Sequence, residues 1–226
     1  MPRVIQRLPD QLTFWNGWHR DRGATGEDPV HVETRERFLT ELPRRRRGCD
    51  VLDIGCGQGH DLAVMARSRH RVTGLDFSAV AIQHARATVP RCGALRLTKP
   101  DLREHDMTQG LPFAGHIFDG VFSHLALHYF EPDVTAFVFD EIRRVLRPGG
   151  VLVFAVKSTK DPYYGRGQRL GDHIFARKGH VRHFFDEEYV RKLLVDWTDI
   201  STDAYGGTYA SSEPSAFIRA VARTAV

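Results

Sequence analysis

Residues 51–62 read "VLDIGCGQGHDL", a stretch in which an apolar run gives way to three closely spaced glycines. The run is apolar around Asp53, which is typical of a buried strand in a parallel sheet. Glycines stand at positions 55, 57 and 59, where the absence of a Cβ lets a ligand approach the backbone closely. Asp61 lies in the first turn of the helix expected next, where the helix dipole favours an acid. The stretch therefore predicts a strand, a ligand-binding loop and a helix in succession.

Apolar runs and helical patterns alternate along the rest of the chain. Strands are expected at 50–54, 71–76, 119–124, 151–156, 197–203 and 216–224, with a weakly defined strand between residues 95 and 105. Helices are expected at 29–42, 59–68, 79–89, 133–146 and 186–195, with Ser78 as an N-cap and "RPGG" (147–150) as a stop. Helices alternating with apolar strands predict an α/β fold, a mostly parallel sheet with helices on both faces.

Composition predicts a globular, cytoplasmic chain with no membrane contact. Hydrophobic residues make up 42% of the 226, yet no run of about 18 apolar residues appears, nor an N-terminal secretory signal. Cys49, Cys56 and Cys92 lack the spacing of a disulfide framework or a zinc site. The net charge is +4, but apart from "RRRR" (44–47) the arginines are spread among acids. Nucleic acid is therefore disfavoured as a partner.

The glycine loop and the acid of the next strand narrow the class of ligand. The glycines follow a G-x-G-x-G pattern instead of the G-x-G-x-x-G of dinucleotide sites, and no G-K-[ST] follows them. Phosphate is therefore disfavoured. Asp76 ends the second strand, 21 residues after Gly55. Its carboxylate can accept hydrogen bonds from both hydroxyls of a ribose, so the expected ligand contains a nucleoside.

Four blocks carry a family resemblance: "VLDIGCGQG" (51–59), "GLDFS" (74–78), "HDMTQGLPFAGHIFDGVFSHLALHYF" (105–130) and "VLRPGGVLVFAV" (145–156). In order and spacing they resemble the class I S-adenosylmethionine-dependent methyltransferases. The resemblance implies a Rossmann-like sheet of seven strands, the last of them antiparallel. A single domain over 1–226 is expected. It would comprise an N-terminal lid or helix (1–47), a cofactor-binding core (48–156), a substrate-covering insertion (157–183), and a C-terminal helix with strands (184–226).

The resemblance also implies roles for the residues around the loop, with S-adenosylmethionine as methyl donor and S-adenosylhomocysteine as product. Asp53 would hold the ammonium group of the donor, Asp76 its ribose and Phe77 its adenine. Asp106 matches the acid that accepts from the adenine amino group, and Asp101 is its competitor. The full set expected at the cofactor is Asp53, Gly55, Cys56, Gly57, Gly59, Asp76, Phe77, Ser78, Asp106, Met107, Ser123 and Trp15. Cys56 is expected to fill space and not to act as a nucleophile.

Methyl transfer is an in-line displacement, so positioning matters most and a base is needed only for a protonated acceptor. His128 and His124, near the end of the fourth strand, are the candidate bases. The expected acceptor-site residues are His128, Tyr129, Tyr163, Tyr164, His173, His180 and His183. No metal site is predicted, because "HVRH" (180–183) lacks a clear third ligand. Trp15, with Phe14 and Trp18, forms either a lid over the cofactor or an anchor for an N-terminal helix.

Several acceptor classes are disfavoured by what the sequence lacks. "DPYY" (161–164) follows the fifth strand and not the fourth, where enzymes acting on exocyclic amines carry a similar motif. The Pro-Cys nucleophile of cytosine-C5 enzymes is absent, and no appended RNA-binding domain is visible. We expect a small-molecule acceptor with an O, N, S or C nucleophile, on a monomer or homodimer. A peptide, protein or RNA acceptor, a non-catalytic cofactor-binding subunit and a nicotinamide-dependent dehydrogenase are the alternatives.

Overall fold

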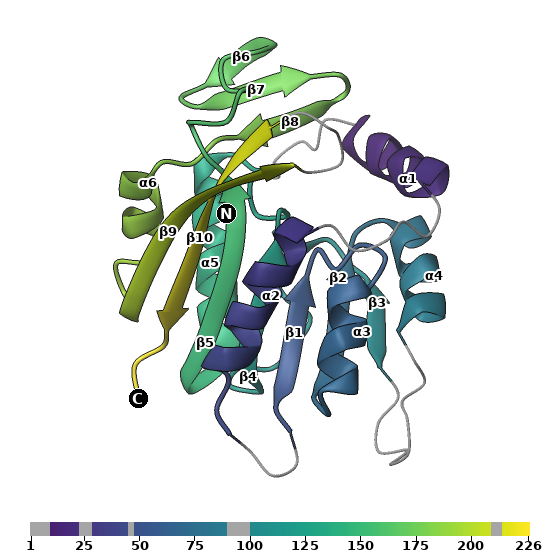
Figure 1. Cartoon of the computed structure of the whole chain (residues 1–226), viewed down its shortest axis with the longest axis vertical. Coiled ribbons are helices and arrows are strands. Elements are labelled where there is room, and N and C mark those ends of the chain that lie inside the picture. Colours follow the sequence, from purple (N-terminus) through teal and green to yellow (C-terminus); the bar gives the residue numbers. More distant parts are fainter. Residues whose placement is uncertain (1–9, 23–28, 45–47, 90–99, 209–213) are drawn as a thin grey trace.

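The computed structural model describes residues 10–22, 29–44, 48–89, 100–208 and 214–226. Within these residues a seven-stranded sheet runs in the order β3-β2-β1-β4-β5-β10-β9 (Figure 1). Its strands are β1 (Asp50–Ile54), β2 (Arg71–Asp76), β3 (Asp101–Glu104), β4 (Phe118–His124), β5 (Leu146–Lys157), β9 (Thr198–Thr208) and β10 (Pro214–Arg223). β1 pairs in parallel with β2 and β4, whereas β10 pairs antiparallel with β5 and β9. The predicted fold class is confirmed, antiparallel last strand included.

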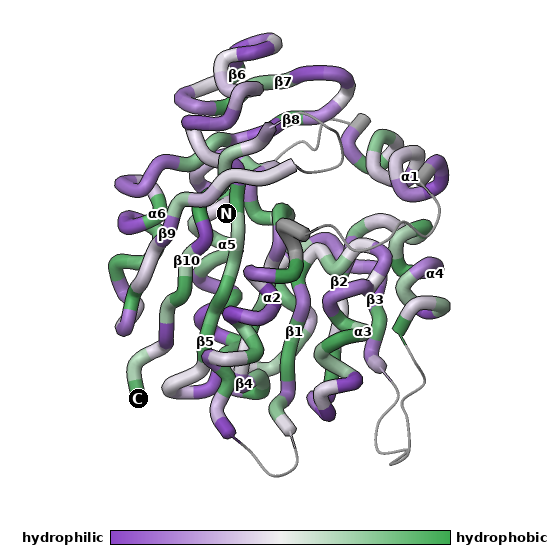
Figure 2. The backbone as a smooth tube through the Cα atoms, in the orientation of Figure 1, coloured by the Kyte–Doolittle hydropathy of each residue, from purple (hydrophilic) through white to green (hydrophobic). Residues whose placement is uncertain are grey.

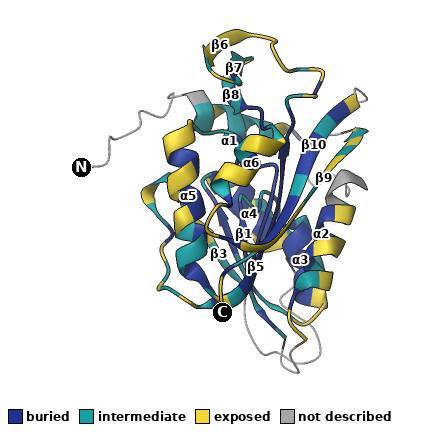
Figure 3. Ribbon diagram, turned by 90° about the vertical axis from the view of Figure 1, so that its left-hand side faces the viewer, coloured by how far each residue is buried: buried dark blue, intermediate teal, exposed yellow. Residues whose placement is uncertain are grey.

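Helices cover both faces of the sheet. α2 (Pro29–Glu41), α3 (His60–Arg67) and α4 (Ala79–Thr88) contribute Phe38, Leu62 and Ile82 to one core cluster. α5 (Pro132–Val145) and α6 (Glu187–Leu193) contribute Val138 and Val190 to the cluster on the other face. Figure 3 shows α5 and α6 on one side of the buried strands and α2 and α3 on the other. The central strands are the most hydrophobic part of the chain (Figure 2), as burial on both faces requires.

The boundaries predicted from the sequence hold with local corrections. Ser78 caps α4 by accepting a hydrogen bond from the backbone N–H of Ala81 at 3.1 Å. "RPGG" does follow the end of α5, but β5 begins at Leu146 and not at 151, because Phe118 already pairs with Leu146. β9 extends to Thr208, beyond the predicted 203, because β10 offers a longer partner. Residues 95–99 of the predicted third strand lie outside the described residues, as do Cys92 and residues 45–47.

A second sheet within 157–183 was missed. β6 (Gln168–Gly171), β7 (Ile174–Arg177) and β8 (His180–His183) form it. Lys178 and Gly179 join β7 to β8 with φ of 49° and 83°. Positive φ at both central residues is the mark of a tight two-residue hairpin turn. Strands of four residues are too short to show the alternation that predicts longer strands.

The predicted lid contains helix α1 (Asp10–Arg22), which contacts α4 and β8. α1 and the small sheet lie on the side of the molecule toward which β1 and β2 point (Figure 1). No helix among the described residues is long and apolar enough to span a membrane. That same part of the chain holds no group of three His, Cys, Asp or Glu side chains arranged for a metal ion.

Candidate cofactor and acceptor site

The glycine loop after β1 is tied to the end of β2. The amides of Gly55 and Cys56 both donate to the carbonyl of Leu75, at 2.8 and 2.9 Å. The amide of Gly57 donates to Oδ2 of Asp76 at 2.9 Å. All three loop glycines have positive φ, which side chains with a Cβ rarely adopt. The loop therefore presents a fixed backbone surface beside the Asp76 carboxylate.

The loop glycines do not all leave room for a ligand, contrary to the expectation from sequence. A Cβ at Gly55 would lie 2.2 Å from Cβ of Ala126, so packing inside the protein requires this glycine. A Cβ at Gly57 would meet only Cε1 of His19, at 3.5 Å. Gly57 is therefore the glycine whose bare backbone faces the space beneath α1.

Asp53 is a buried carboxylate without a counter-charge. Its exposed fraction is 3%, and within the described part of the chain it forms neither a hydrogen bond nor an ion pair. Burial raises the pKa of Asp53 well above its ordinary value, and the nearby carboxylates of Asp61 and Asp76 raise it further. Asp61 is paired with Arg35 of α2 at 3.1 Å, so its role is wider than the expected helix-dipole interaction. A buried carboxylate in this state favours a cationic ligand group.

The Asp76 carboxylate accepts hydrogen bonds from the loop and can accept a further one. Its two oxygens accept from the amides of Gly57 and Ser78, each at 2.9 Å. Burial raises the pKa of Asp76 to about 6, and these hydrogen bonds oppose the rise. The backbone N–H of Phe77 is a third donor to Asp76. An ionised carboxylate has about four acceptor positions, so about one stays available for a hydroxyl donor.

The structure separates the two candidate adenine acids. Asp101 begins β3 opposite Thr73, in the middle of β2, and pairs with Arg103 at 2.6 Å. Asp106 follows β3 at its carboxyl end and caps the short 3-10 helix η1 (Met107–Gln109) by accepting from Thr108 at 3.1 Å. Only Asp106 therefore lies at the same edge of the sheet as the loop.

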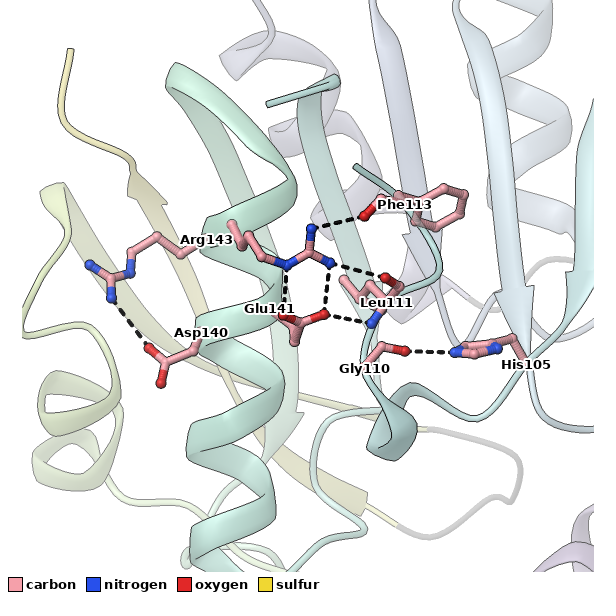
Figure 4. A network of polar contacts seen from close by, with 8 residues as sticks. His105, Gly110, Leu111, Phe113, Asp140, Glu141 and Arg143 are labelled. Carbon is pink, nitrogen blue, oxygen red and sulfur yellow. Dashed lines mark hydrogen bonds and ion pairs between the residues drawn. The ribbon is translucent and has the colours of Figure 1, made fainter. Parts of the chain in front are cut away.

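The segment that carries Asp106 is braced by α5 (Figure 4). Glu141 accepts from the amide of Leu111 at 2.7 Å, and Arg144 pairs with Glu141. Arg144 also donates to the carbonyls of Leu111 and Phe113, at 3.0 and 2.8 Å. These bonds fix the loop between η1 and β4 against a helix of the core.

α1 contacts both the glycine loop and the lining of a cavity. Its Asn16 accepts from the Ser78 hydroxyl at 2.6 Å, and its His19 lies over Gly57. Trp15 of the same helix packs edge-on against Tyr129 with the ring centroids 5.0 Å apart. Tyr129 and Trp15 line a cavity of about 330 Å³ that also borders on the small sheet.

Comparison with known proteins agrees with this arrangement. A model of the methyltransferase domain family matches residues 52–154. A malonyl-[acyl-carrier protein] O-methyltransferase of Enterobacter lignolyticus is 34% identical over 168 residues, covering 73% of this chain and 61% of the relative. A probable S-adenosylmethionine-dependent methyltransferase of Mycolicibacterium smegmatis is 35% identical over 127 residues, covering 56% of this chain and 45% of the relative. Residues 52–154 belong to the methyltransferase domain family.

Solved structures share the fold of this methyltransferase chain. A 1,6-didemethyltoxoflavin-N1-methyltransferase of Burkholderia thailandensis, solved with S-adenosylhomocysteine, has a TM-score of 0.69 at 20% identity, covering 95% of this chain and 86% of that chain. A Methanosarcina mazei S-adenosylmethionine-dependent methyltransferase also has a TM-score of 0.69, covering 89% of this chain and all of that one. This chain spans about half the length of the first curated relatives it matches.

Several of the predicted cofactor residues form structural contacts. Ser123 donates to the carbonyl of Ile54 at 2.9 Å and joins β4 to β1. Cys56 is buried, and burial raises the pKa of its thiol well above the ordinary value, so it is no thiolate nucleophile. Met107 is buried, its Cε 4.0 Å from the position of a Cβ at Gly55. Phe77, half-buried, follows Asp76 at the end of β2.

The predicted acceptor residues divide into two groups. Tyr129, Tyr163 and His180 line the cavity. Tyr164 and His173 lie outside the lining, and the Tyr164 hydroxyl is 2.7 Å from Nδ1 of His173. His183 also lies outside it, packed against Phe185 and Tyr189 with ring centroids 4.8 and 4.7 Å away.

The two candidate bases are both buried near the end of β4. His128 is fully buried, and neither ring nitrogen has a hydrogen-bond partner in the described part of the chain. Burial lowers the pKa of His128 well below its ordinary value, with Arg182 and Lys157 lowering it further, so the ring is neutral at pH 7. Its centroid lies 4.4 Å from that of Tyr129. His124 lies stacked on Phe122 with the centroids 6.4 Å apart.

Sequence reasoning missed the charged residues of the cavity. Lys157 ends β5 in a buried ion pair with Asp161 at 2.7 Å, and it donates to Ser215 at the same distance. Arg177 and Arg182 reach the cavity from β7 and β8. In "FARKGHVR" (175–182), large and small side chains alternate on either side of Lys178-Gly179. That alternation was the available sequence signal for a hairpin.

Proposed function

We propose that this chain transfers a methyl group from S-adenosylmethionine to a nucleophile of a small molecule, leaving S-adenosylhomocysteine. One observation carries the proposal: the buried, unpaired Asp53 carboxylate lies beside the glycine loop and Asp76. A ligand with an ammonium group and a ribose would give Asp53 a counter-charge and Asp76 a hydroxyl donor. Such a ligand needs no phosphate site.

The residues present fit that cofactor. Asp53 would hold its ammonium group, and Asp76 would accept from the ribose through its remaining acceptor position. Asp106, at the carboxyl end of β3, would accept from the adenine amino group, with Phe77 and Met107 beside the ring. The bound cofactor supplies an electrophilic methyl carbon. The chain supplies a fixed position for it and, through α1, a cover that keeps water away.

His128 is proposed as the base where the acceptor carries a proton. Its ring is neutral at pH 7 and its nitrogens form no hydrogen bond within the described residues, so a nitrogen is free to accept a proton. Its lowered pKa makes it a weak base, which suits only an accepting atom that becomes strongly acidic during methyl transfer. His124 is the alternative, one turn earlier at the end of β4. The cavity of about 330 Å³ supports a small acceptor over a peptide, protein or RNA. A monomer or homodimer stays the prediction for the assembly, to be measured by light scattering.

Titration calorimetry tests the cofactor assignment. We expect S-adenosylmethionine and S-adenosylhomocysteine to bind and NAD not to bind. Asp53→Asn keeps the shape of the side chain but removes its charge, so we expect the affinity for S-adenosylhomocysteine to fall at least tenfold. Asp101→Asn, at the start of β3 and paired with Arg103, is the control and is expected to bind normally. Binding of NAD alone would overturn the proposal, and so would an Asp53→Asn variant with wild-type affinity.

A further inference from the structure

One face of the small sheet lines the cavity. β7 and β8 pair so that Phe175 lies opposite Arg182 and Arg177 lies opposite His180. Side chains of directly paired residues share a face, and residues two apart on a strand do as well. These four side chains therefore lie on one face of the sheet, and all four line the cavity.

The described side chains that line the cavity carry an excess of positive charge. Among the described residues five cationic side chains line it and no carboxylate does: Lys157, Arg166, Arg177, Lys178 and Arg182. Lys157 is paired with the buried Asp161. The other four form no ion pair with a carboxylate within the described part of the chain. The surrounding positive charge and burial lower the pKa of His180 to about 4, so that ring stays neutral.

Aromatic rings hold these cations in place and form flat walls. The Arg177 guanidinium lies 4.5 Å from the centroid of Tyr163, and the Arg166 guanidinium lies 5.4 Å from the same ring. The Arg182 guanidinium lies 5.9 Å from the centroid of Tyr129. α1 adds Phe14 and Trp15 to the lining, with the Phe14 ring stacked on His180 at 4.6 Å. Flat aromatic walls favour a planar ligand.

We propose that the cavity binds a methyl acceptor in which a planar conjugated ring carries an oxyanion, held by Arg177 and Arg182 with the ring between the aromatic side chains. This inference rests on the proposed function, because it names the acceptor of that site. Guanidinium groups bind carboxylates and phosphates through paired, charge-assisted hydrogen bonds. A cavity of about 330 Å³ holds a molecule of one or two rings.

The oxyanion is the anchor, and the methylated atom lies elsewhere on the acceptor. Hydrogen bonds from arginine occupy the lone pairs of the oxyanion and weaken it as a nucleophile. In the transfer, a lone pair of the accepting atom forms the bond to the methyl carbon while the C–S bond breaks. The bonding electron pair stays on sulfur, which becomes a neutral thioether. A proton on the accepting atom leaves to a base or to water.

Calorimetry with matched probes tests the charge requirement. The probes are 4-hydroxybenzoate, phenyl phosphate and the neutral 4-hydroxybenzamide, each titrated with and without saturating S-adenosylhomocysteine. We expect at least one anionic probe to bind at least tenfold more tightly than the amide. The two anions distinguish a carboxylate from a phosphate ligand. Equal affinity for the amide overturns the proposal. Tighter binding of a single-stranded RNA oligonucleotide that displaces the anionic probes also overturns it.

Variants locate the binding. Arg177→Gln and Arg182→Gln are each expected to weaken the anionic probe at least tenfold and to leave the affinity for S-adenosylhomocysteine unchanged. Arg169→Gln is the matched control, because Arg169 belongs to the same small sheet but pairs with Asp172 outside the cavity lining. Thermal unfolding shows whether each variant is folded. Unchanged probe affinity in both folded variants overturns the proposal. If the wild type does not bind S-adenosylhomocysteine, the proposed function is contradicted instead. The two tests stay separate because the probes are also titrated without S-adenosylhomocysteine.

Discussion

Asp76 holds the glycine loop and, in the proposed function, the ribose as well. Its pKa of about 6 makes that second role pH-dependent. Above pH 6 the ionised carboxylate accepts from both the loop and the ribose, whereas below pH 6 protonation removes acceptor capacity. The folded pKa lies above the ordinary 3.8, so Asp76 also contributes less to fold stability as the pH rises from about 4 to 6.

We therefore expect the affinity for S-adenosylhomocysteine to be constant above pH 6 and to fall as the pH drops below it, by up to about tenfold per unit. Calorimetry between pH 5 and pH 8 measures this. Asp76→Asn cannot ionise, so its affinity is expected to be weaker at pH 8 and to lose the step near pH 6. The buried Asp53 also titrates above its ordinary range and contributes to any decline that remains in the variant. A wild-type affinity independent of pH would refute the role of Asp76.

α1 is the element on which the cofactor loop and the cavity both depend. Asn16 ties it to the N-cap of α4, and Trp15 ties it to Tyr129. Asn16→Ala removes one of these ties while Ser78 keeps its capping bond to Ala81. We expect the affinity for S-adenosylhomocysteine to fall about threefold to tenfold, since a net hydrogen bond contributes about 1 kcal/mol.

Thr13→Ala is the matched control for that change, because Thr13 is exposed on the same helix. Both variants are to be compared by calorimetry and by thermal unfolding. Equal affinity in the two variants would show that α1 does not position the cofactor.

Prediction from sequence succeeded where a pattern was local and failed where the site is assembled from distant segments. The loop from Asp53 to Gly59 and the acid at Asp76 follow from one strand–loop–helix unit and its neighbour. The choice of Asp106 over Asp101 needed the position of β3, because both acids flank a strand of only four residues. Lys157 and Ser215 are 58 positions apart, and only the antiparallel pairing of β10 with β5 brings them together.

At the scale of the whole molecule, ionisation of the unpaired Asp53 carboxyl costs stability until a cation neutralises it, and its raised pKa reflects that cost. The glycine loop, β2 and α1 meet at the same place, so a bound cofactor would tie three elements together. Any ligand that binds the folded chain alone stabilises it, by about 2.7 kcal/mol at a concentration of 100 times Kd. For a domain of 150–250 residues each kcal/mol raises Tm by roughly 2–4 °C.

We therefore expect S-adenosylhomocysteine at 100 times its Kd to raise Tm by roughly 5–11 °C, measured by calorimetric or fluorescence unfolding. Asp53→Asn removes the buried charge, so the unliganded variant is expected to unfold at a higher temperature than the unliganded wild type. The same variant should gain less from a fixed concentration of ligand, because it lacks the partner of the ammonium group. The two effects have opposite signs, which a general loss of packing cannot produce. A variant that is less stable without ligand and gains as much from it would assign Asp53 to the fold alone.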